Sequence, residues 1–314
     1  MTKVIVTGGS GFIGSHIVEE LLEHQFDVTV IDNFSTGHRE NLENVDVDIL
    51  EYDITNPSVI PLIVSLQPDY IIHQAAQVSV VESVKNPLND EHVNIKGSLH
   101  MIEAAIQSNV KKFVFASSAA VYGNPSSLPI SVEHETVPES PYGLSKLTVE
   151  HYLDMCSKLY QLPYSILRYS NVYGPKQDAK GEGGVVAIFS ECLSKHISPM
   201  IYGDGEQTRD FIFVKDVAKA NVRAMLCKDN LCVNVSSGQS ISINRLFEVM
   251  KEVAGSDVLA IYKESRLGDI RDSLLDNVGT KALLNWEPSY DIYEGLKETI
   301  QYANKQREIK QFIS

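Results

Sequence analysis

The sequence has 314 residues, of which 43% are hydrophobic and 22% are charged, a balance typical of a globular protein with a sizeable core. Its 27 basic and 41 acidic residues give a formal net charge of −14, which argues against nucleic acid or an anionic membrane as a partner. An anionic substrate would therefore need a few arginines placed around it.

The four cysteines, Cys156, Cys192, Cys227 and Cys232, form no C-x-x-C pair, and no histidine stands at metal-ligand spacing from them. We therefore expect reduced thiols and no metal site. No apolar run approaches the length of about 18 residues that a membrane span needs. The sequence begins on a strand-like run that goes straight into a glycine loop, so we expect no signal peptide and a cytoplasmic location.

Short apolar runs alternate with amphipathic stretches in the first half of the chain. The predicted strands are Lys3–Thr7, Asp27–Asp32, Val47–Glu51, Tyr70–Gln74, Lys112–Ser117 and Pro163–Tyr169. The predicted helices between them include Gly11–His24, Pro87–Ser108 and Tyr142–Tyr160. This alternation predicts an α/β fold with a Rossmann-type, doubly wound parallel sheet.

The regular alternation ends near Pro175, where a polar, glycine-rich loop runs to Gly184. Helices are predicted beyond it at Val185–Lys195 and at Ile243–Val253, the second with Ser242 as its N-cap. We expect residues 1–175 to form the larger domain and residues 176–314 mainly a smaller α/β domain that holds the substrate, with some segments returning to the main sheet.

A glycine loop, T-G-G-S-G-F-I-G, follows the first predicted strand and places Gly8, Gly11 and Gly14 ahead of an amphipathic helix. Glycines at this spacing permit a tight turn and a close approach of the backbone to a pyrophosphate, which the start of the helix attracts. Asp32 ends the second strand, where a carboxylate accepts hydrogen bonds from the adenosine ribose and repels the 2′-phosphate of NADP. The larger domain is therefore predicted to bind NAD, with Asp53 as a candidate adenine contact. A structural turn, and a plain strand-end aspartate at Asp53, are the alternatives.

Tyr142 and Lys146 form Y-x-x-x-K, which places both side chains on one face of a predicted helix. An ammonium beside a phenol lowers the pKa of the phenol and makes the tyrosine a usable base. A second copy at Tyr293–Lys297 is interpreted as surface helix. Ser117 and Ser118 end the fifth predicted strand, at the edge where open α/β sheets bind ligands, and either hydroxyl can contact the tyrosine and a substrate oxygen. A strand-end serine that caps a turn is the alternative.

Taken together, these residues resemble the extended short-chain dehydrogenase/reductase family, and within it the NAD-dependent nucleotide-sugar 4-epimerases. The motifs that carry the resemblance are T-G-G-S-G-F-I-G, D-N-F-S-T-G, H-Q-A-A-Q-V-S-V, S-S-A-A-V-Y-G, P-Y-G-L-S-K, R-Y-S-N-V-Y-G-P, Y-G-D-G-E-Q-T-R-D-F-I-F-V-K-D and R-L-G-D-I-R-D-S. The resemblance implies an isomerase that interconverts UDP-glucose and UDP-galactose, and also UDP-GlcNAc and UDP-GalNAc, through a transient 4-keto sugar and enzyme-bound NADH.

The resemblance also implies which residues form the site, with Ser118, Tyr142 and Lys146 as the catalytic set and no metal. The implied NAD contacts are Gly8, Gly11, Phe12, Ile13, Gly14, Asp32, Asn33, Ser35, Thr36, Gly37, Asp53, Ile54, Gln74, Ala75, Ala76, Asn94, Ser117, Tyr142, Lys146, Tyr169 and Val172. The implied substrate contacts are Val78, Ser118, Ala119, Ala120, Tyr142, Asn171, Val185, Val186, Tyr202, Arg209, Arg266, Asp269 and Ser273. Among these, Asn171, Arg209 and Arg266 are the expected ligands of the nucleotide diphosphate.

Two details of the sequence choose among the relatives, and one further position departs from them. Ala119 and Ala120 stand where related dehydratases and decarboxylases carry carboxylates, which favours epimerisation. Ser170 stands where relatives usually carry an aromatic residue, and we expect this to change packing more than chemistry. Ser273 stands where a tyrosine is associated with exclusion of 2-acetamido sugars, so a serine predicts their acceptance, unless the loop carries it away from the sugar.

The same residues leave three other functions open. A UDP-glucuronate 4-epimerase would need a donor for the C6 carboxylate, which we cannot place from the sequence. A net dehydrogenase would release NADH, and an NAD-sensing binding module would not need the tyrosine and lysine. The resemblance further implies a homodimer in which Pro87–Ser108 and Tyr142–Tyr160 pair with their copies in a four-helix bundle.

Overall fold

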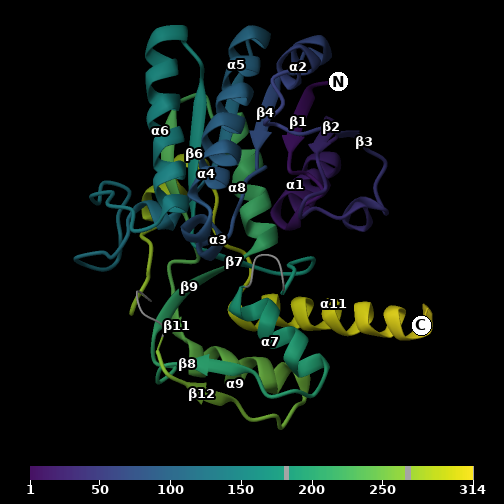
Figure 1. Ribbon diagram of the computed structural model, residues 1–314, viewed down its shortest axis with the longest axis vertical. Coiled ribbons are helices and arrows are strands. Elements are labelled where there is room, and N and C mark those ends of the chain that lie inside the picture. Colours follow the sequence, from purple (N-terminus) through teal and green to yellow (C-terminus); the bar gives the residue numbers. More distant parts are fainter. Residues whose placement is uncertain (180–183, 266–269, 314) are drawn as a thin grey trace.

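Seven parallel strands form the central sheet of the protein, which a computed structural model describes over residues 1–179, 184–265 and 270–313 (Figure 1). In the order in which they lie side by side, the strands are β10 (Leu231–Val235), β6 (Tyr164–Tyr169), β5 (Lys112–Ser118), β4 (Tyr70–His73), β1 (Lys3–Thr7), β2 (Asp27–Asp32) and β3 (Asp48–Glu51). The six strands predicted from the sequence agree with this to within one residue at each end. The predicted Rossmann-type α/β fold is confirmed.

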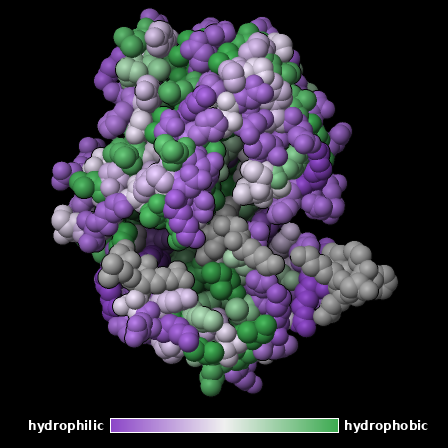
Figure 2. All heavy atoms as spheres, viewed as in Figure 1, coloured by the Kyte–Doolittle hydropathy of each residue, from purple (hydrophilic) through white to green (hydrophobic). Residues whose placement is uncertain are grey.

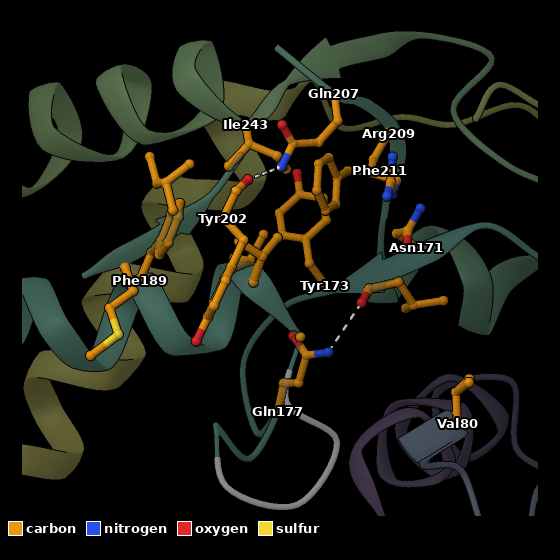
Figure 3. A pocket seen from close by; sticks show the side chains of 16 residues that line it. Val80, Asn171, Tyr173, Gln177, Phe189, Tyr202, Gln207, Arg209, Phe211 and Ile243 are labelled. Atoms are coloured by element: carbon orange, nitrogen blue, oxygen red, sulfur yellow. Dashed lines mark hydrogen bonds between the residues drawn. The ribbon is translucent and has the colours of Figure 1, made fainter. Parts of the chain in front are cut away.

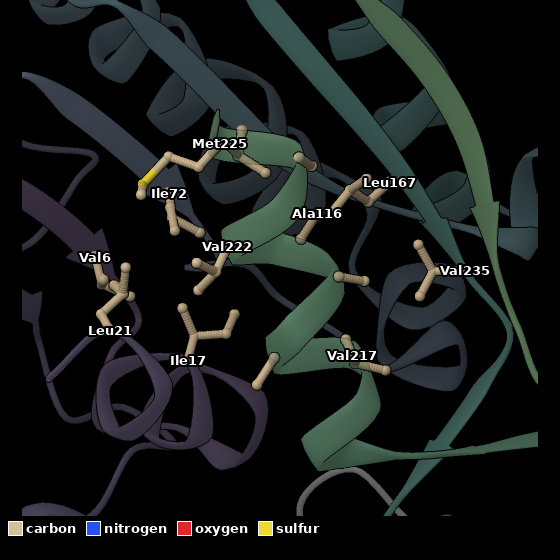
Figure 4. Packing of buried hydrophobic residues seen from close by; sticks show 14 of the residues in the cluster. Val6, Ile17, Leu21, Ile72, Ala116, Leu167, Val217, Val222, Met225 and Val235 are labelled. Atoms are coloured by element: carbon tan, nitrogen blue, oxygen red, sulfur yellow. The ribbon is translucent and has the colours of Figure 1, made fainter. Parts of the chain in front are cut away.

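Helices cover both faces of this sheet, because its strands are apolar on both sides. One face packs against α1 (Phe12–Glu23) and α8 (Val214–Leu226), whose side chains Ile17, Leu21, Val217 and Val222 meet the strands in Figure 4. The other face packs against α2 (Val59–Leu66), α5 (Ser98–Ser108) and α6 (Pro141–Tyr160). The molecule therefore has three layers, with the sheet in the middle.

The helix predicted at Pro87–Ser108 is continuous but not uniform. It begins as α4 (Pro87–Asp90), passes through the π-helical segment η2 (Glu91–Gly97), and continues as α5. Asn94 lies inside the π-helical segment and is 2% exposed. Segments of this kind occur frequently at functional sites, and this one packs against α6.

Two elements that follow residue 175 in the sequence belong to the large sheet and its cover. Strand β10 pairs in parallel with β6, from Leu231 beside Ser165 to Val235 beside Tyr169. Helix α8 packs directly against α1. The later part of the chain therefore completes the layer that the first part begins.

The smaller part of the protein is built on short strands. One sheet has the order β11 (Ser240–Ser242), β9 (Thr208–Phe213) and β7 (Asn171–Tyr173), and a second pairs β12 (Ile261–Lys263) with β8 (Met200–Tyr202). The helices of this part are α7 (Val185–Ser194), α9 (Ile243–Ala254) and α11 (Ile292–Ile313), whereas α10 (Val278–Leu284) packs against β10 and α8 of the larger part. An apolar cluster that includes Phe189, Phe247 and Leu296 joins α7, α9 and α11.

Two predictions about this part are confirmed. Ser242 caps α9, because its hydroxyl oxygen accepts a hydrogen bond from the backbone N–H of Arg245 at 3.2 Å. The second Y-x-x-x-K copy lies on α11, where Tyr293 is 49% exposed and Lys297 is also exposed. It is therefore surface helix, as predicted.

Hydrophilic side chains cover most of the larger part on the face drawn in Figure 2, and this face is hollowed where the larger and smaller parts meet. Within residues 1–179, 184–265 and 270–313, no helix combines the length and apolarity needed to cross a membrane. The same residues contain no grouping of three or more His, Cys, Asp or Glu side chains arranged to hold a metal ion.

Leu153 and Leu159 on α6 offer a matched test of this packing. Leu153 is fully buried against the sheet, whereas Leu159 is 64% exposed. We expect Leu153→Ala to lower the free energy of unfolding by about 2–5 kcal/mol through lost burial and a residual cavity. Leu159→Ala should change it by less than about 0.5 kcal/mol. Urea unfolding followed by circular dichroism measures both, and equal effects would contradict the assigned orientation of α6.

Candidate active site

A cavity of about 720 Å³ opens at the carboxyl edge of β1, β2 and β4. Most of the predicted NAD contacts line it, and so does Val78, which was predicted as a substrate contact. The NAD contacts in its wall are Gly8, Gly11, Phe12, Ile13, Gly14, Asp32, Asn33, Ser35, Thr36, Gly37, Asp53, Ile54, Gln74, Ala75 and Ala76. The glycine loop and three strand ends thus meet around one space, which we call the dinucleotide cavity.

Two of the glycines are required by close backbone contacts. Gly8 has a φ of +66°, and a Cβ there would lie 2.7 Å from the backbone nitrogen of Ala75. A Cβ on Gly14 would lie 2.1 Å from the carbonyl oxygen of Gly8. No side chain caps the start of α1 at Gly11, so the first N–H groups of the helix remain available to an anion. This arrangement fits a pyrophosphate.

Asp32 is buried at the end of β2 and lines the same cavity. Its Oδ2 accepts from the backbone N–H of Ser10 at 2.9 Å, and its Oδ1 accepts from that of Phe34 at 2.8 Å. Burial raises the pKa of Asp32, while these two hydrogen bonds oppose the rise. Asn33 reaches across to Asp53 at 3.0 Å. The carboxylate is therefore held in one orientation, with spare lone pairs for a ligand.

A second cavity, of about 530 Å³, lies between β7, β8, β9 and α7 in the smaller part (Figure 3). Five predicted substrate contacts line it, namely Asn171, Val185, Val186, Tyr202 and Arg209, together with Val172, which was predicted as an NAD contact. We call this space the nucleotide cavity. Val80 of α3 (Val80–Lys85) faces it from the larger part, whereas its neighbour Ser79 lines the dinucleotide cavity.

Asn171 and Arg209 lie on neighbouring strands at one end of the nucleotide cavity, as Figure 3 shows. The Asn171 amide donates to the carbonyl oxygen of Asp210 at 3.2 Å. The Arg209 guanidinium donates to the carbonyl oxygens of Thr208 at 2.8 Å and Arg271 at 3.2 Å. These bonds aim a cation and an amide at the cavity, as recognition of an anion requires.

The predicted catalytic residues lie at the ends of β5 and α6. Lys146 is 4% exposed, donates to the carbonyl oxygen of Ala116 at 2.9 Å, and lies 5.8 Å from the centre of the Tyr142 ring. Burial lowers the pKa of Lys146 to about 8, although nearby carboxylates act against this. Tyr142 is in the first turn of α6, which Ser140 caps through the N–H of Gly143. The helix geometry therefore brings the ammonium and the phenol together.

The two adjacent serines at the end of β5 have different surroundings. Ser117 is 2% exposed and its hydroxyl donates to the Glu150 carboxylate, which in turn forms a bidentate ion pair with Arg168. Ser118 is half-buried, and its oxygen accepts from the N–H of Ala120 at 3.1 Å. The Ser118 hydroxyl hydrogen therefore remains available to a ligand, while that of Ser117 is committed to a buried carboxylate.

Some predicted contacts lie outside both cavities. The buried side chains of Asn94 and Tyr169 bond to other protein groups, namely Gln77 and the pair Gln74 and Asn221, respectively. Ala119 and Ala120 form the short turn η3 (Ala119–Val121) after Ser118. Arg266 and Asp269 lie outside the described residues.

Two serines that mark departures from relatives also lie outside the cavity walls. Ser273 is half-buried, and its N–H donates to the carbonyl oxygen of Thr208 at 3.2 Å, which holds it beside β9. The Ser170 hydroxyl donates to the buried Asp210 carboxylate at 3.3 Å. Ser170 thus contributes to packing and hydrogen bonding at the start of β7.

Other residues of the two walls were not predicted from the sequence. In the dinucleotide cavity they include Tyr52, Thr55, Gln77, Glu82, Asn89, His92 and Val93, and in the nucleotide cavity Tyr173, Gln177, Phe189, Gln207, Phe211 and Ile243. These side chains come from strands, helices and loops that tertiary packing brings to the cavities. Gln77, Tyr173, Gln207 and Phe211 stand in the quoted motifs, but the motifs do not show that these side chains face a cavity.

Comparison with known proteins agrees with this geometry. The NAD dependent epimerase/dehydratase family matches residues 4–235. A putative UDP-glucose 4-epimerase of Methanocaldococcus jannaschii is 43% identical over 300 residues, which are 95% of this chain and 97% of the relative.

Solved structures show the same likeness. The UDP-glucose 4-epimerase of Thermotoga maritima, determined with UDP-glucose, superposes with a TM-score of 0.94 at 43% identity and covers 98% of this chain and 100% of its own. A UDP-N-acetylglucosamine 4-epimerase of Methanobrevibacter ruminantium, in complex with UDP-N-acetylmuramic acid, gives 0.92 at 40% identity, with 97% and 99% covered. The resemblance inferred from the motifs is confirmed, and the chain belongs to the NAD dependent epimerase/dehydratase family.

Proposed function

We propose that the protein is a UDP-hexose 4-epimerase that works with NAD. The observation that carries this proposal is the placement of the Tyr142–Lys146 pair beside the carboxyl end of β5, at the edge of the sheet where the dinucleotide cavity also opens. Ser79 and Val80, neighbours in sequence, line one cavity each, so the two spaces border the same short segment. One cavity has the features of a dinucleotide site, and the other presents an arginine and an amide for a diphosphate.

NAD fits the dinucleotide cavity. The start of α1 beside Gly8 and Gly14 would hold the pyrophosphate, Asp32 the adenosine ribose, and Asp53 the adenine. No lysine or arginine is found among the described residues that line this cavity, which favours NAD over NADP because a 2′-phosphate would meet only the Asp32 carboxylate. When bound, NAD supplies the acceptor and the donor of the hydride at C4 of the sugar.

The chain's own residues handle the proton and the charge. The Tyr142 phenolate takes the proton of the C4 hydroxyl and later returns it, while the Lys146 ammonium stabilises the phenolate. Ser118 hydrogen-bonds the same sugar oxygen. Asn171 and Arg209 bind the diphosphate, and Arg209 locally offsets the net charge of −14. Ala119 and Ala120 offer no carboxylate for an elimination.

The substrate range is part of the proposal. We propose that Ser273 leaves room beside the sugar and that UDP-GlcNAc is therefore turned over as well as UDP-glucose. The likeness to a UDP-N-acetylglucosamine 4-epimerase supports this. A small side chain held beside β9 by its backbone is consistent with a position near the substrate.

A homodimer through α6 is also proposed. Leu144 and Met155 on α6 are 55% and 43% exposed, and Leu88 on α4 is 79% exposed. Apolar side chains at this density on neighbouring helices favour burial against a second copy of the chain.

Proton NMR tests the reaction directly. The purified protein, without added cofactor, is given UDP-glucose and UDP-GlcNAc in separate tubes. We expect the anomeric signal of the matching galacto sugar to grow in both. If no galacto signal grows in either tube even after NAD is added, the proposal is wrong, and UDP-glucuronate becomes the next substrate to test.

Ser117 and Ser118 provide a matched pair of variants. We expect Ser118→Ala to lower kcat by about 10²-fold or more, with little change in stability, because its hydroxyl serves the reacting oxygen. Ser117→Ala should lower the free energy of unfolding by about 1.5–3 kcal/mol, because it removes a bond to buried Glu150, and should leave most of kcat. Steady-state kinetics and thermal unfolding separate the two, and the reverse pattern would assign the catalytic hydroxyl to Ser117.

Ser273→Tyr tests the substrate range. The larger side chain should abolish turnover of UDP-GlcNAc while UDP-glucose is still epimerised, because only the 2-acetamido group needs the space. Initial rates on the two sugars measure this, with Ser273→Ala as the control that keeps both activities. Unchanged turnover of UDP-GlcNAc by the tyrosine variant would place Ser273 away from the sugar.

A further inference from the structure

Asp90 is a buried carboxylate for which the proposed chemistry has no use. It ends α4, at the point where the helix changes to the π-helical segment η2, and it is 1% exposed. Its Oδ1 accepts from the amide of Gln77 at 2.9 Å and from that of Asn94 at 3.0 Å. Both partners are neutral. A buried charge is costly unless it is hydrogen-bonded and balanced, so this carboxylate requires an explanation.

The hydrogen bonds of Asp90 hold the loop at Gln77, which runs into the Ser79–Val80 segment that borders both cavities. Asn94, held by Asp90, clamps the backbone of Gln77: its amide donates to the Gln77 carbonyl at 2.9 Å, and its carbonyl accepts from the Gln77 N–H at 2.8 Å. Gln77 lines the dinucleotide cavity just before Val78 and Ser79. The Asn94 amide also lies 3.2 Å from the hydroxyl of Ser145, the residue before Lys146. Asp90 thereby links the loop that borders both cavities to the catalytic helix.

Asp90 also acts on the charge of Lys146. Within the described part of the chain, the titratable groups that face Lys146 are Tyr142 and Glu150 from α6, Asp90 from α4, and His73 from β4. His73 stays neutral, because burial lowers its pKa to about 3. Glu150 is already balanced by its bidentate ion pair with Arg168. Asp90 is therefore the carboxylate near Lys146 whose hydrogen-bond partners carry no charge.

The effects on the two pKa values are consistent with this geometry. Burial lowers the pKa of Lys146 to about 8. Asp90 opposes this fall more strongly than Glu150 does. Burial raises the pKa of Asp90, and Lys146 acts in the opposite direction. Each group therefore favours the charged form of the other across the interface between α4 and α6.

We propose that Asp90 is a positioning residue of the reaction, which holds the loop at Gln77 in register with α6 and keeps the Lys146 ammonium charged beside Tyr142. This inference rests on the proposed function, because it takes Tyr142 as the base that the ammonium serves. It concerns a residue that neither lines a cavity in the described structure nor belongs to the predicted site.

The test compares Asp90→Asn with Asp154→Asn, the same change on exposed α6 surface, where Asp154 pairs with Lys158 at 2.6 Å. The kcat for UDP-glucose is measured from pH 6 to pH 9 with NAD present. Loss of the Asp90 charge lets the pKa of Lys146 fall further, so the alkaline limb of the profile moves down by about one pH unit. For a limb near pH 8, kcat then falls about fivefold at pH 8 and less than twofold at pH 6. Asp154→Asn should keep the limb in place.

An unshifted limb in Asp90→Asn, whatever the loss in kcat, would overturn the electrostatic part of the proposal and leave a structural role. Asp90→Glu restores a carboxylate and should return the limb toward its original position. A failure of Asp90→Glu to do so while Asp90→Asn shifts the limb would assign the shift to distorted packing, and would also count against the proposal.

A stability cycle separates this inference from the proposed function. Thermal unfolding is followed for the wild type, Asp90→Asn, Lys146→Met and the double variant. If the two charges interact, Asp90→Asn lowers Tm less in the Lys146→Met background than in the wild type, and equal losses would overturn the interaction. This readout needs no activity, so it remains decisive even if the protein fails to epimerise UDP-sugars. Asp90→Ser replaces Asp90→Asn in the cycle if that variant does not fold.

Discussion

The ion pair between Glu150 and Arg168 holds α6 on the sheet. Arg168 lies near the carboxyl end of β6, and its guanidinium meets both oxygens of Glu150 on α6, at 3.0 and 2.6 Å. Ser117 on β5 donates to the same carboxylate, and Arg168 also donates to the hydroxyl of Tyr122, which donates to Asn234 on β10. Because each group is satisfied by the next, the network tolerates burial. It also fixes where Tyr142 and Lys146 lie relative to Ser118, since they project from the same helix that Glu150 holds.

The elements of this fold that the sequence predicts well are those with a strong local signal. The six parallel strands are apolar on both faces, and Gly8 and Gly14 occupy positions where any side chain would strike the backbone, so both leave a clear pattern. The strands β7, β8, β11 and β12 have three residues each, which is too short for a period of two to be recognised. The change from α-helix to π-helix at Glu91 depends on what Asn94 can reach in three dimensions, and no spacing in the sequence records it.

The residues of the candidate site also fall into those that the sequence predicts and those that only the structure identifies. Asp32, Arg209 and the Tyr142–Lys146 pair stand in motifs, and the structure brings them to two adjoining cavities or to the sheet edge beside them. The alternation of side chains along a strand predicts that Ser117 and Ser118 point to opposite faces of the sheet. Only the position of Glu150 shows that the Ser117 hydroxyl is the one bonded to a buried carboxylate. Asp90, Gln77 and Gln207 have their surroundings set by contacts between distant segments. The sequence alone gives Asp90 no distinguishing feature, and the motifs that contain Gln77 and Gln207 do not show what these side chains contact.

The strand at the edge of the large sheet has a consequence for how the protein is made. Strand β10 and helix α8 come late in the chain, yet β10 supplies the hydrogen-bond partner of β6 and α8 covers the face shared with α1. During synthesis, the polypeptide up to Tyr173 therefore leaves the ribosome with an unpaired strand edge and with apolar residues such as Ile17 and Leu167 uncovered. Completion of the layer waits for about sixty further residues, at roughly 5–20 residues per second. The polypeptide encoded by a gene fragment ending near residue 175 would form a sheet without its outer strand. A strand of another molecule could pair with the exposed edge and cause aggregation.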